Sequence, residues 1–311
     1  MTTNVRVMVP LRITPDAVKS GTTIAEPNTA GGETAWVASA TYTVGDEKTN
    51  AGYKWLCILG HTGRATAPAF DPLYWTRNGS SDRMSPFDDY TSTKARATGS
   101  LTYVIQPGFF GAVKVYGLEG DTCTITLKDE PGGSVVMTNT LDLYAQAAGF
   151  YELLFTVLPM LEQVGIDSVE VLPEAELTIT VTAGGGGAVA VGGIKVGDWR
   201  NLIGEGSFGG VSYGASAERK TYTYRKYEDD GTYTTVIRSQ SRDVSCKVTM
   251  DAEQAMYVDS VLGEIIDMAV PFEVSGLPHY GYLNTLGFVT GSIEADSYNT
   301  TTLSLNIKGN I

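Results

Sequence analysis

The stretch Glu-Leu-Thr-Ile-Thr-Val-Thr, residues 176–182, alternates strictly between polar and apolar side chains. Because successive side chains of a strand point to opposite faces, this period of two predicts a strand with one buried face and one solvated face. Similar short apolar runs recur between residues 100 and 175, separated by Gly, Pro, Asn and Asp. Strands at this spacing without helical periodicity predict a jelly-roll-like antiparallel β-sandwich over residues 83–196. The apolar members of the first stretch are Leu177, Ile179 and Val181.

The chain beyond the sandwich combines a hairpin signal with one helical pattern. Two β-like segments, Lys220–Tyr227 and Thr232–Ser239, flank Asp230-Gly231, a dipeptide typical of tight hairpin turns. A helix is expected from about Ala252 to Met268, with Asp251 as its N-cap. Its apolar residues fall on one stripe, which predicts a face packed on a core. The stripe comprises Ala255, Val258, Val261, Leu262, Ile265 and Ile266.

Residues 31–82 are dense in aromatic side chains and turn signals. So short a unit needs its largest rings inside, and Trp36, Tyr53 and Trp75 are expected to form its core. Trp55 and Tyr74 are the pair expected to remain exposed. Exposed rings of this kind stack on the C–H faces of sugars, so these two residues are the candidate glycan-binding site.

Composition and charge exclude several classes of protein. The 311 residues carry a formal net charge of −13, which disfavours binding to nucleic acid or to anionic membranes. No apolar run approaches the ~20 residues of a membrane span, and the N-terminus lacks the pattern of a signal peptide. We therefore expect synthesis in a cytoplasm and no membrane insertion. The scarce cysteines and the two histidines predict no disulfide framework, metal site or cofactor; Cys57, Cys123 and Cys246 are expected to be buried and free.

Three motifs imitate catalytic sites. Residues 203–211 resemble the glycine-rich loop of kinases, but the companion motifs are missing downstream. Residues 210–214 match the Gly-x-Ser-x-Gly pattern of hydrolases around Ser212, yet a β-like run follows instead of a helix. The pair Asp88-Asp89 offers two carboxylates without any indication of a sugar cleft between them. Each motif is interpreted as a turn, and no catalytic residue is assigned.

The aromatic unit resembles the small chitin-binding carbohydrate modules. The resemblance rests on Trp36, Tyr42-x-x-Gly45-Asp46, Gly52-Tyr53, Pro68 and Trp75. It implies a small β module with an affinity for sugars.

The order of parts along nearly the whole chain is similar to a family of tailed-bacteriophage virion proteins, often labelled tail or carbohydrate-binding proteins. The similarity is carried by Val5–Glu26, the aromatic unit, Met84–Asp89, Pro107–Phe109, Gly117–Gly120, Leu172-Pro173, Gly193–Gly197, Ile203-Gly204, Tyr213-Gly214, Asp230-Gly231, the helix and Gly287-Phe288. It implies a structural component of the virion tail, at the tip, baseplate or fibre-attachment region, and not an enzyme. The implied partners are other tail proteins, copies of the chain itself and, as a further candidate, host-surface glycans.

Together these observations predict a mainly β protein in three parts behind an N-terminal arm. The arm, residues 1–30, is expected to dock elsewhere as a strand, with disorder as the alternative. The parts are a small aromatic-rich module over 31–82, the sandwich over 83–196, and a β-rich C-terminal domain with one α-helix over 197–311. A glycan-binding adhesion module is the alternative function.

Overall fold

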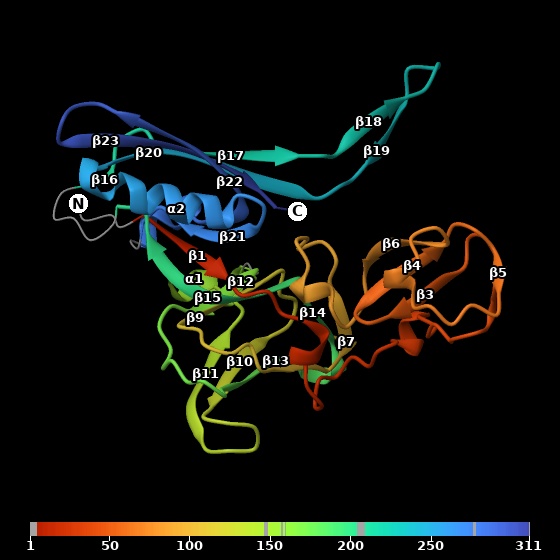
Figure 1. Ribbon diagram of the computed structural model, residues 1–311. Helices are drawn as coiled ribbons and strands as arrows, with labels where there is room; N and C mark the ends of the chain where they lie inside the picture. Colours follow the sequence, from red (N-terminus) through yellow and green to blue (C-terminus); the bar gives the residue numbers. More distant parts are fainter. Residues whose placement is uncertain are drawn as a thin grey trace.

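The computed structural model describes residues 5–145, 149–156, 158, 160–203, 209–275 and 278–310. More of the described residues lie in strands than in helices, which confirms the mainly β fold. Figure 1 shows an aromatic-rich module on one side, a sandwich below, and a sheet with one long helix above.

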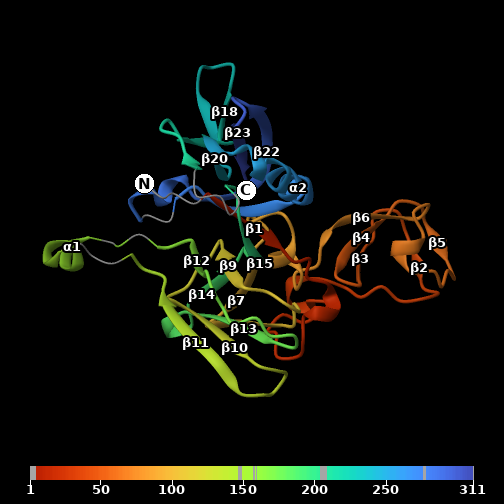
Figure 2. The ribbon, with the colours of Figure 1, turned by 60° about the vertical axis from the view of Figure 1, so that its left-hand side comes forward.

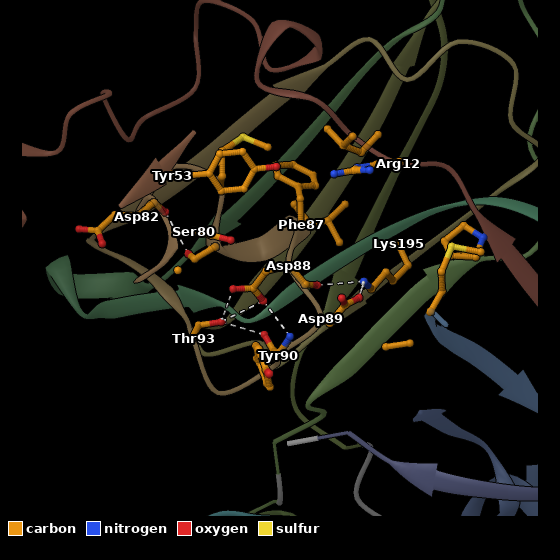
Figure 3. A pocket seen from close by; sticks show the side chains of 18 of the residues that line it. Arg12, Tyr53, Ser80, Asp82, Phe87, Asp88, Asp89, Tyr90, Thr93 and Lys195 are labelled. Atoms are coloured by element: carbon orange, nitrogen blue, oxygen red, sulfur yellow. Dashed lines mark hydrogen bonds and ion pairs between the residues drawn. The ribbon is translucent and has the colours of Figure 1, made fainter. Parts of the chain in front are cut away.

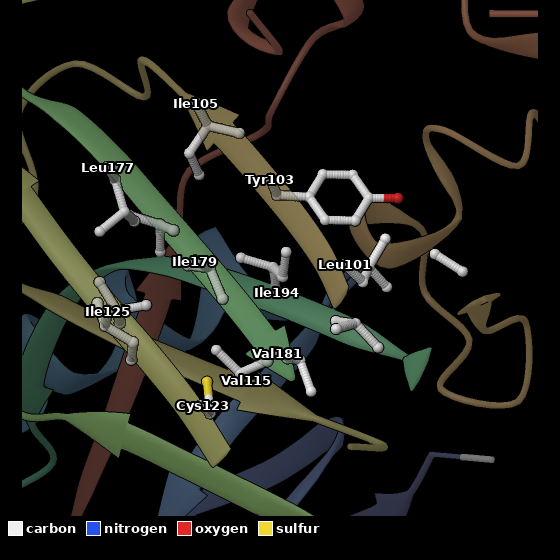
Figure 4. Close-up of a cluster of buried hydrophobic side chains, with 14 of the residues drawn as sticks. Leu101, Tyr103, Ile105, Val115, Cys123, Ile125, Leu177, Ile179, Val181 and Ile194 are labelled. Atoms are coloured by element: carbon white, nitrogen blue, oxygen red, sulfur yellow. The ribbon is translucent and has the colours of Figure 1, made fainter. Parts of the chain in front are cut away.

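One wall of the sandwich is a four-stranded antiparallel sheet. Its strands are β8 (Ser100–Ile105), β10 (Thr122–Lys128), β11 (Val135–Asp142) and β13 (Glu176–Thr182), in the order β11-β10-β13-β8. The alternation predicted for β13 is confirmed, because Leu177, Ile179 and Val181 point into the core and are almost completely buried (Figure 4). Threonines join the strands on the outer face, as in the 2.7 Å hydrogen bond between Oγ1 atoms of Thr122 and Thr182.

The facing wall belongs to a larger sheet. Its strands here are β9 (Ala112–Tyr116), β12 (Gln163–Ile166) and β15 (Gly193–Asn201), in the order β12-β9-β15. Val115 and Ile194 from this wall meet Ile125 of the first wall in one apolar cluster (Figure 4). A separate two-stranded sheet pairs β7 (Ala95–Thr98) with β14 (Ala188–Val191), and a short helix, α1 (Phe150–Phe155), follows β11.

The N-terminal segment is a central strand of the larger sheet. Strand β1 (Arg6–Pro10) pairs with β15 along its whole length and with β21 (Ala269–Glu273) on its other side. The N-terminal arm, expected to dock elsewhere, therefore joins its own chain, and Val5 and Val7 are buried in a second apolar cluster, which belongs to the C-terminal part. Strand β15 also runs through residue 197, so the sandwich and the C-terminal part share a continuous sheet.

The C-terminal part completes this ten-stranded sheet. Its long strands are β20 (Gln240–Asp251), β22 (Thr285–Ala295) and β23 (Thr300–Gly309), and β16 (Gly209–Val211) and β17 (Ser216–Thr221) both pair with β20. Alternation again sends one set of side chains inward, including Val244, Val248, Leu303 and Leu305.

The predicted helix lies against this sheet as α2 (Ala255–Ile265), entered through a 3-10 turn over Ala252–Gln254. Val258, Val261 and Ile265 are buried against the sheet, which confirms the central part of the stripe. The helix ends at Ile265, three residues before the expected end at Met268, and two further details differ from the prediction. Ile266 is exposed, because it lies at the end of the helix where the stripe has rotated off the core, and the Asp251 side chain makes no capping hydrogen bond.

A two-stranded hairpin extends from this sheet away from the rest of the molecule (Figure 1). It pairs β18 (Tyr224–Tyr227) with β19 (Tyr233–Val236), as the Asp-Gly signal predicted. Gly231 adopts a φ of +82°, a conformation that favours glycine, and the Asp230 carboxylate accepts the backbone N–H and the hydroxyl of Thr232. From here on, the arm means residues 219–242, from the end of β17 to the start of β20, and residues 1–30 are the N-terminal segment.

The aromatic-rich module contains a three-stranded sheet in the order β3-β4-β6 and a two-stranded sheet of β2 and β5. The strands are β2 (Thr41–Tyr42), β3 (Glu47–Asn50), β4 (Tyr53–Cys57), β5 (His61–Thr62) and β6 (Trp75–Ser80). Trp75 is 2% exposed and packs with Tyr42 and Cys57. The remaining 3-10 turns of the described chain are Pro15–Ala17, Thr29–Gly31, Pro68–Phe70, Ser85–Phe87, Gly184–Gly186 and Pro278–Leu283. Cys57, Cys123 and Cys246 are buried and free, as predicted.

Candidate functional site

The candidate glycan residues lie in the module, where both are half-buried. Trp55 is in the middle of β4, Tyr74 directly precedes β6, and both pack against the cluster that contains Trp75. The sequence predicted a more exposed pair. The difference arises because both rings pack against the buried Trp75 cluster, while Tyr53 lies against Trp55 and Arg64 covers Tyr74.

A cation covers one face of the Tyr74 ring. The guanidinium carbon of Arg64 lies 4.0 Å from the ring centroid, a cation–π geometry. Asp71, which is buried, accepts from Arg64 Nε at 2.7 Å and so fixes that position. The His61 ring meets Tyr74 edge-on, with centroids 5.1 Å apart. A sugar that stacks on Tyr74 would therefore have to use the opposite face or displace Arg64.

The Trp55 indole is held in one orientation. Its Nε1 donates a hydrogen bond to the backbone oxygen of Asn50 at 3.2 Å, and the Tyr53 ring meets it at 83° with centroids 6.4 Å apart. Tyr53 is itself covered by Arg77, whose guanidinium carbon lies 3.8 Å from the ring centroid. The module thus repeats one arrangement, an arginine stacked on a tyrosine, at two places.

The interior of the module holds polar atoms without partners among the described residues. They are Nε1 of Trp36, Nε1 of Trp75 and both ring nitrogens of His61. An unpaired buried group costs about 1–3 kcal/mol. Ring packing has to offset this cost, and His61 makes edge contacts with Tyr42 and Trp75 as well as with Tyr74.

The most exposed apolar side chains of the module are not the candidate pair Trp55 and Tyr74. Phe70 is 81% exposed and Leu73 is 74% exposed. Phe70 lies between Pro68 and Pro72, and Leu73 follows Pro72 directly before Tyr74. The sequence holds a signal for the exposure of Phe70, because an aromatic residue between two prolines lies in a loop that regular strand packing does not bury.

A pocket of about 1030 Å³ opens where the three parts of the molecule meet. The module contributes Tyr53 and Arg77, the N-terminal segment contributes Arg12, and the sandwich contributes Lys195. Figure 3 shows Tyr53 and Phe87 on one side of the pocket and a set of carboxylates on the other.

The polar groups of this junction pocket are engaged with one another. The Asp88 carboxylate accepts from the backbone N–H of Tyr90 at 2.7 Å and from Thr93 Oγ1 at 2.8 Å (Figure 3). Lys195, which is buried, donates to the backbone oxygen of Asp88 at 2.9 Å, and Asp89 Oδ1 lies 3.8 Å from its Nζ. Burial raises the pKa of Asp88 and lowers the pKa of Lys195. These contacts fix the link between module and sandwich, in agreement with the interpretation of Asp88-Asp89 as turn residues.

The other two motifs lie in the C-terminal part. Of the kinase-like stretch, residues 204–208 lie outside the described residues. Ser212 follows β16, its N–H donates to the backbone oxygen of Lys247, and the chain then turns into β17. No helix follows the serine, so this segment lacks the strand-turn-helix geometry of a nucleophile elbow.

Within the described ranges, no group of three or more His, Cys, Asp or Glu side chains is arranged to hold a metal ion. None of the described helices has the length and apolar character needed to cross a membrane. Comparison of the chain with protein-family models, with curated proteins and with solved structures found no match.

Proposed function

We propose that the chain is a structural component of a bacteriophage tail, built into the tip, baseplate or fibre-attachment region through contacts with copies of itself and with other tail proteins. The proposal starts from the order of parts along the chain. It is supported by two elements that extend from the body and present large apolar side chains to solvent.

The observation that carries the proposal is helix α1. Figure 2 shows it extending away from the sandwich. Phe150, Tyr151 and Phe155 are 76%, 75% and 71% exposed, and the rings of Tyr151 and Phe155 lie against each other with centroids 5.0 Å apart. Aromatic residues are enriched in protein–protein interfaces, and an exposed cluster of them marks a surface that another protein covers.

The arm is the second such element. Tyr224, Tyr227 and Tyr233 are exposed along it, and Ile237 is exposed at its base. The rings of Tyr227 and Tyr233 lie 5.8 Å apart between centroids. Both α1 and the arm would be covered in an assembly, while the net charge of −13 keeps the free chain soluble beforehand.

Mass spectrometry of virions tests this function. Particles of the phage that encodes the chain would be purified on a density gradient, and the tails separated from the capsids. We expect peptides of the chain in the tail fraction, at a constant ratio to other tail proteins. Their absence from particles, with the chain abundant in the lysate, would contradict the proposal.

A glycan-binding adhesion module is the alternative, and the exposed pair Phe70 and Leu73 beside Tyr74 favours it. A glycan array probed with the full chain would test it. This alternative predicts binding that is lost in Phe70→Ala and Tyr74→Ala, and retained in Phe150→Ala, which removes an equally exposed ring outside the module. An array without signal for the wild-type chain would exclude the glycans it displays.

A further inference from the structure

Three arginines surround a pocket at the base of the arm. The pocket measures about 760 Å³, and Arg219, Arg238 and Arg242 line it on the arm side. Glu162 of the sandwich and Thr285 of β22 belong to the opposite side. We call it the arginine pocket.

The positive charges of the arginine pocket are poorly compensated. Arg219 lies directly opposite Arg242 in the β17–β20 ladder, and like charges at such a position are destabilising. Burial and then the charge of Arg219 lower the pKa of Arg242, with Glu162 acting in the opposite direction. Over the described ranges no carboxylate lies within ion-pair distance of any of the three guanidinium groups. The pocket is therefore suited to an anionic group from outside.

The tip of the arm carries the opposite charge. Glu228, Asp229 and Asp230 form three consecutive exposed carboxylates at the turn. Glu228 pairs with Lys226 at 3.1 Å, while Asp230 accepts from Thr232. Among the described residues, Asp229 and Asp230 have no cationic partner, so the tip keeps a net negative charge.

We infer that the arginine pocket receives the acidic arm tip of a second copy of this chain. From base to tip the arm spans about ten residues, roughly 30 Å at the rise of a strand. Two arms lying antiparallel would place each tip at the base of the other, which is the reciprocal contact of a two-fold dimer. The arm is a two-stranded sheet, so each of its strands also keeps one edge available for pairing.

The tyrosines of the arm fit the same arrangement. Arg225 lies 5.1 Å from the centroid of the Tyr233 ring, and Arg238 lies 5.1 Å from that of Tyr224. Antiparallel arms would cover these exposed rings along their length, and the charged ends would set the register. Electrostatic complementarity of this kind governs specificity and register more than raw affinity.

The inference rests on the proposed function for its partner, a second copy. Its test measures self-association in solution and is separate from the presence of the chain in virions. If the chain is found in tails but its self-association does not depend on the charges of the arm, only the inference is refuted. Chains that pair through their arms yet never enter particles would refute the tail function alone.

A charge exchange tests the contact. Glu228→Lys with Asp229→Lys reverses the tip and keeps Asp230, which holds the turn. Arg219→Glu with Arg242→Glu reverses the pocket. In sedimentation-velocity titrations at low salt, we expect each double variant to associate about a hundredfold more weakly than the wild-type chain. An equimolar mixture of the two variants should regain association, because both contacts of the mixed dimer are then complementary.

Matched variants control for net charge. Glu130→Lys with Glu174→Lys, at exposed sites of the sandwich, makes the same charge change as the tip variant, and Lys247→Glu with Lys308→Glu makes the same change as the pocket variant. Both should associate like wild type, and circular dichroism should show the same fold for all. Three results would overturn the inference: a wild-type chain that stays monomeric, variants that associate normally, or a mixture without rescue. A pocket that binds inorganic phosphate in calorimetry while its reversal leaves association unchanged would also overturn it.

Discussion

Gly197 lies where β15 passes from the sandwich into the C-terminal sheet, opposite Pro10 of β1. A side chain has no room there. A Cβ on Gly197 would lie 3.0 Å from Pro10 Cα and well inside van der Waals contact with the backbone oxygen of Val9. Both neighbours are backbone, so Gly197→Ala forces the two strands apart. Overpacking of this kind costs about 3 kcal/mol of unfolding free energy.

Urea unfolding followed by tryptophan fluorescence measures the effect, with Gly263→Ala as the matched control. Gly263 lies on the exposed side of α2, and nothing approaches its Cβ position within 4 Å. The same substitution there should raise the free energy of unfolding by about 1 kcal/mol, because alanine is the better helix former. Equal stability of Gly197→Ala and the wild-type chain would refute the close approach of β1 and β15, and with it the joining of the two cores by the N-terminal strand.

Three further predictions concern the cores and one ion-pair cluster. Ile179→Ala should lose about 3 kcal/mol of unfolding free energy, because it leaves a cavity in the sandwich. Thr180→Ala, on the outer face, should lose about 1 kcal/mol or less. Similar losses for the two variants in urea titrations would contradict the assignment of faces. For Asp167, burial raises the pKa, but the hydrogen bonds and charges of Lys114 and Arg6 outweigh it and lower the pKa below its ordinary value. The stabilisation from Asp167 is therefore complete above the unfolded-state pKa of about 3.9 and is lost as pH falls through the lower folded-state pKa. In thermal melts, the difference in melting temperature between the wild-type chain and Asp167→Asn should shrink below about pH 4. A difference that stays constant with pH would contradict this. Burial raises the pKa of Cys123 and Cys246 to about 12, so both should resist iodoacetamide at neutral pH until the chain unfolds, whereas rapid labelling of the native chain in mass spectra would show that they are accessible.

The elements that the sequence predicted well are those specified by local pattern. The alternation around Ile179, the Asp230-Gly231 turn and the stripe through Val258 each depend on residues a few positions apart, and each element formed where expected. Such signals come from the period of the chain itself and need no knowledge of a distant partner.

The features that escaped prediction depend on pairing between distant segments. Nothing in Val5–Pro10 indicates that its partners are residues near 200 and 270. The opposition of Arg219 and Arg242 likewise follows from the register of β17 on β20, which is set by the whole hairpin between them.

The candidate site was predicted only in part, for a related reason. Of the three rings expected to form the core of the module, Trp75 is buried and Trp36 packs against it, but Tyr53 lies outside this cluster and lines the junction pocket. How deeply each ring lies depends on Arg64 and Arg77, which stack on Tyr74 and Tyr53. The sequence does not show which arginine covers which ring.

Immunogold electron microscopy of intact phage particles tests the proposed place of the chain in the tail. Antibodies raised against the full chain would be applied to purified particles and to the same lysate depleted of particles. We expect gold at one defined position on the tail in most particles, at the tip, the baseplate or the attachment point of the fibres. Unlabelled tails in particles, with all of the antigen in the depleted lysate, would contradict it.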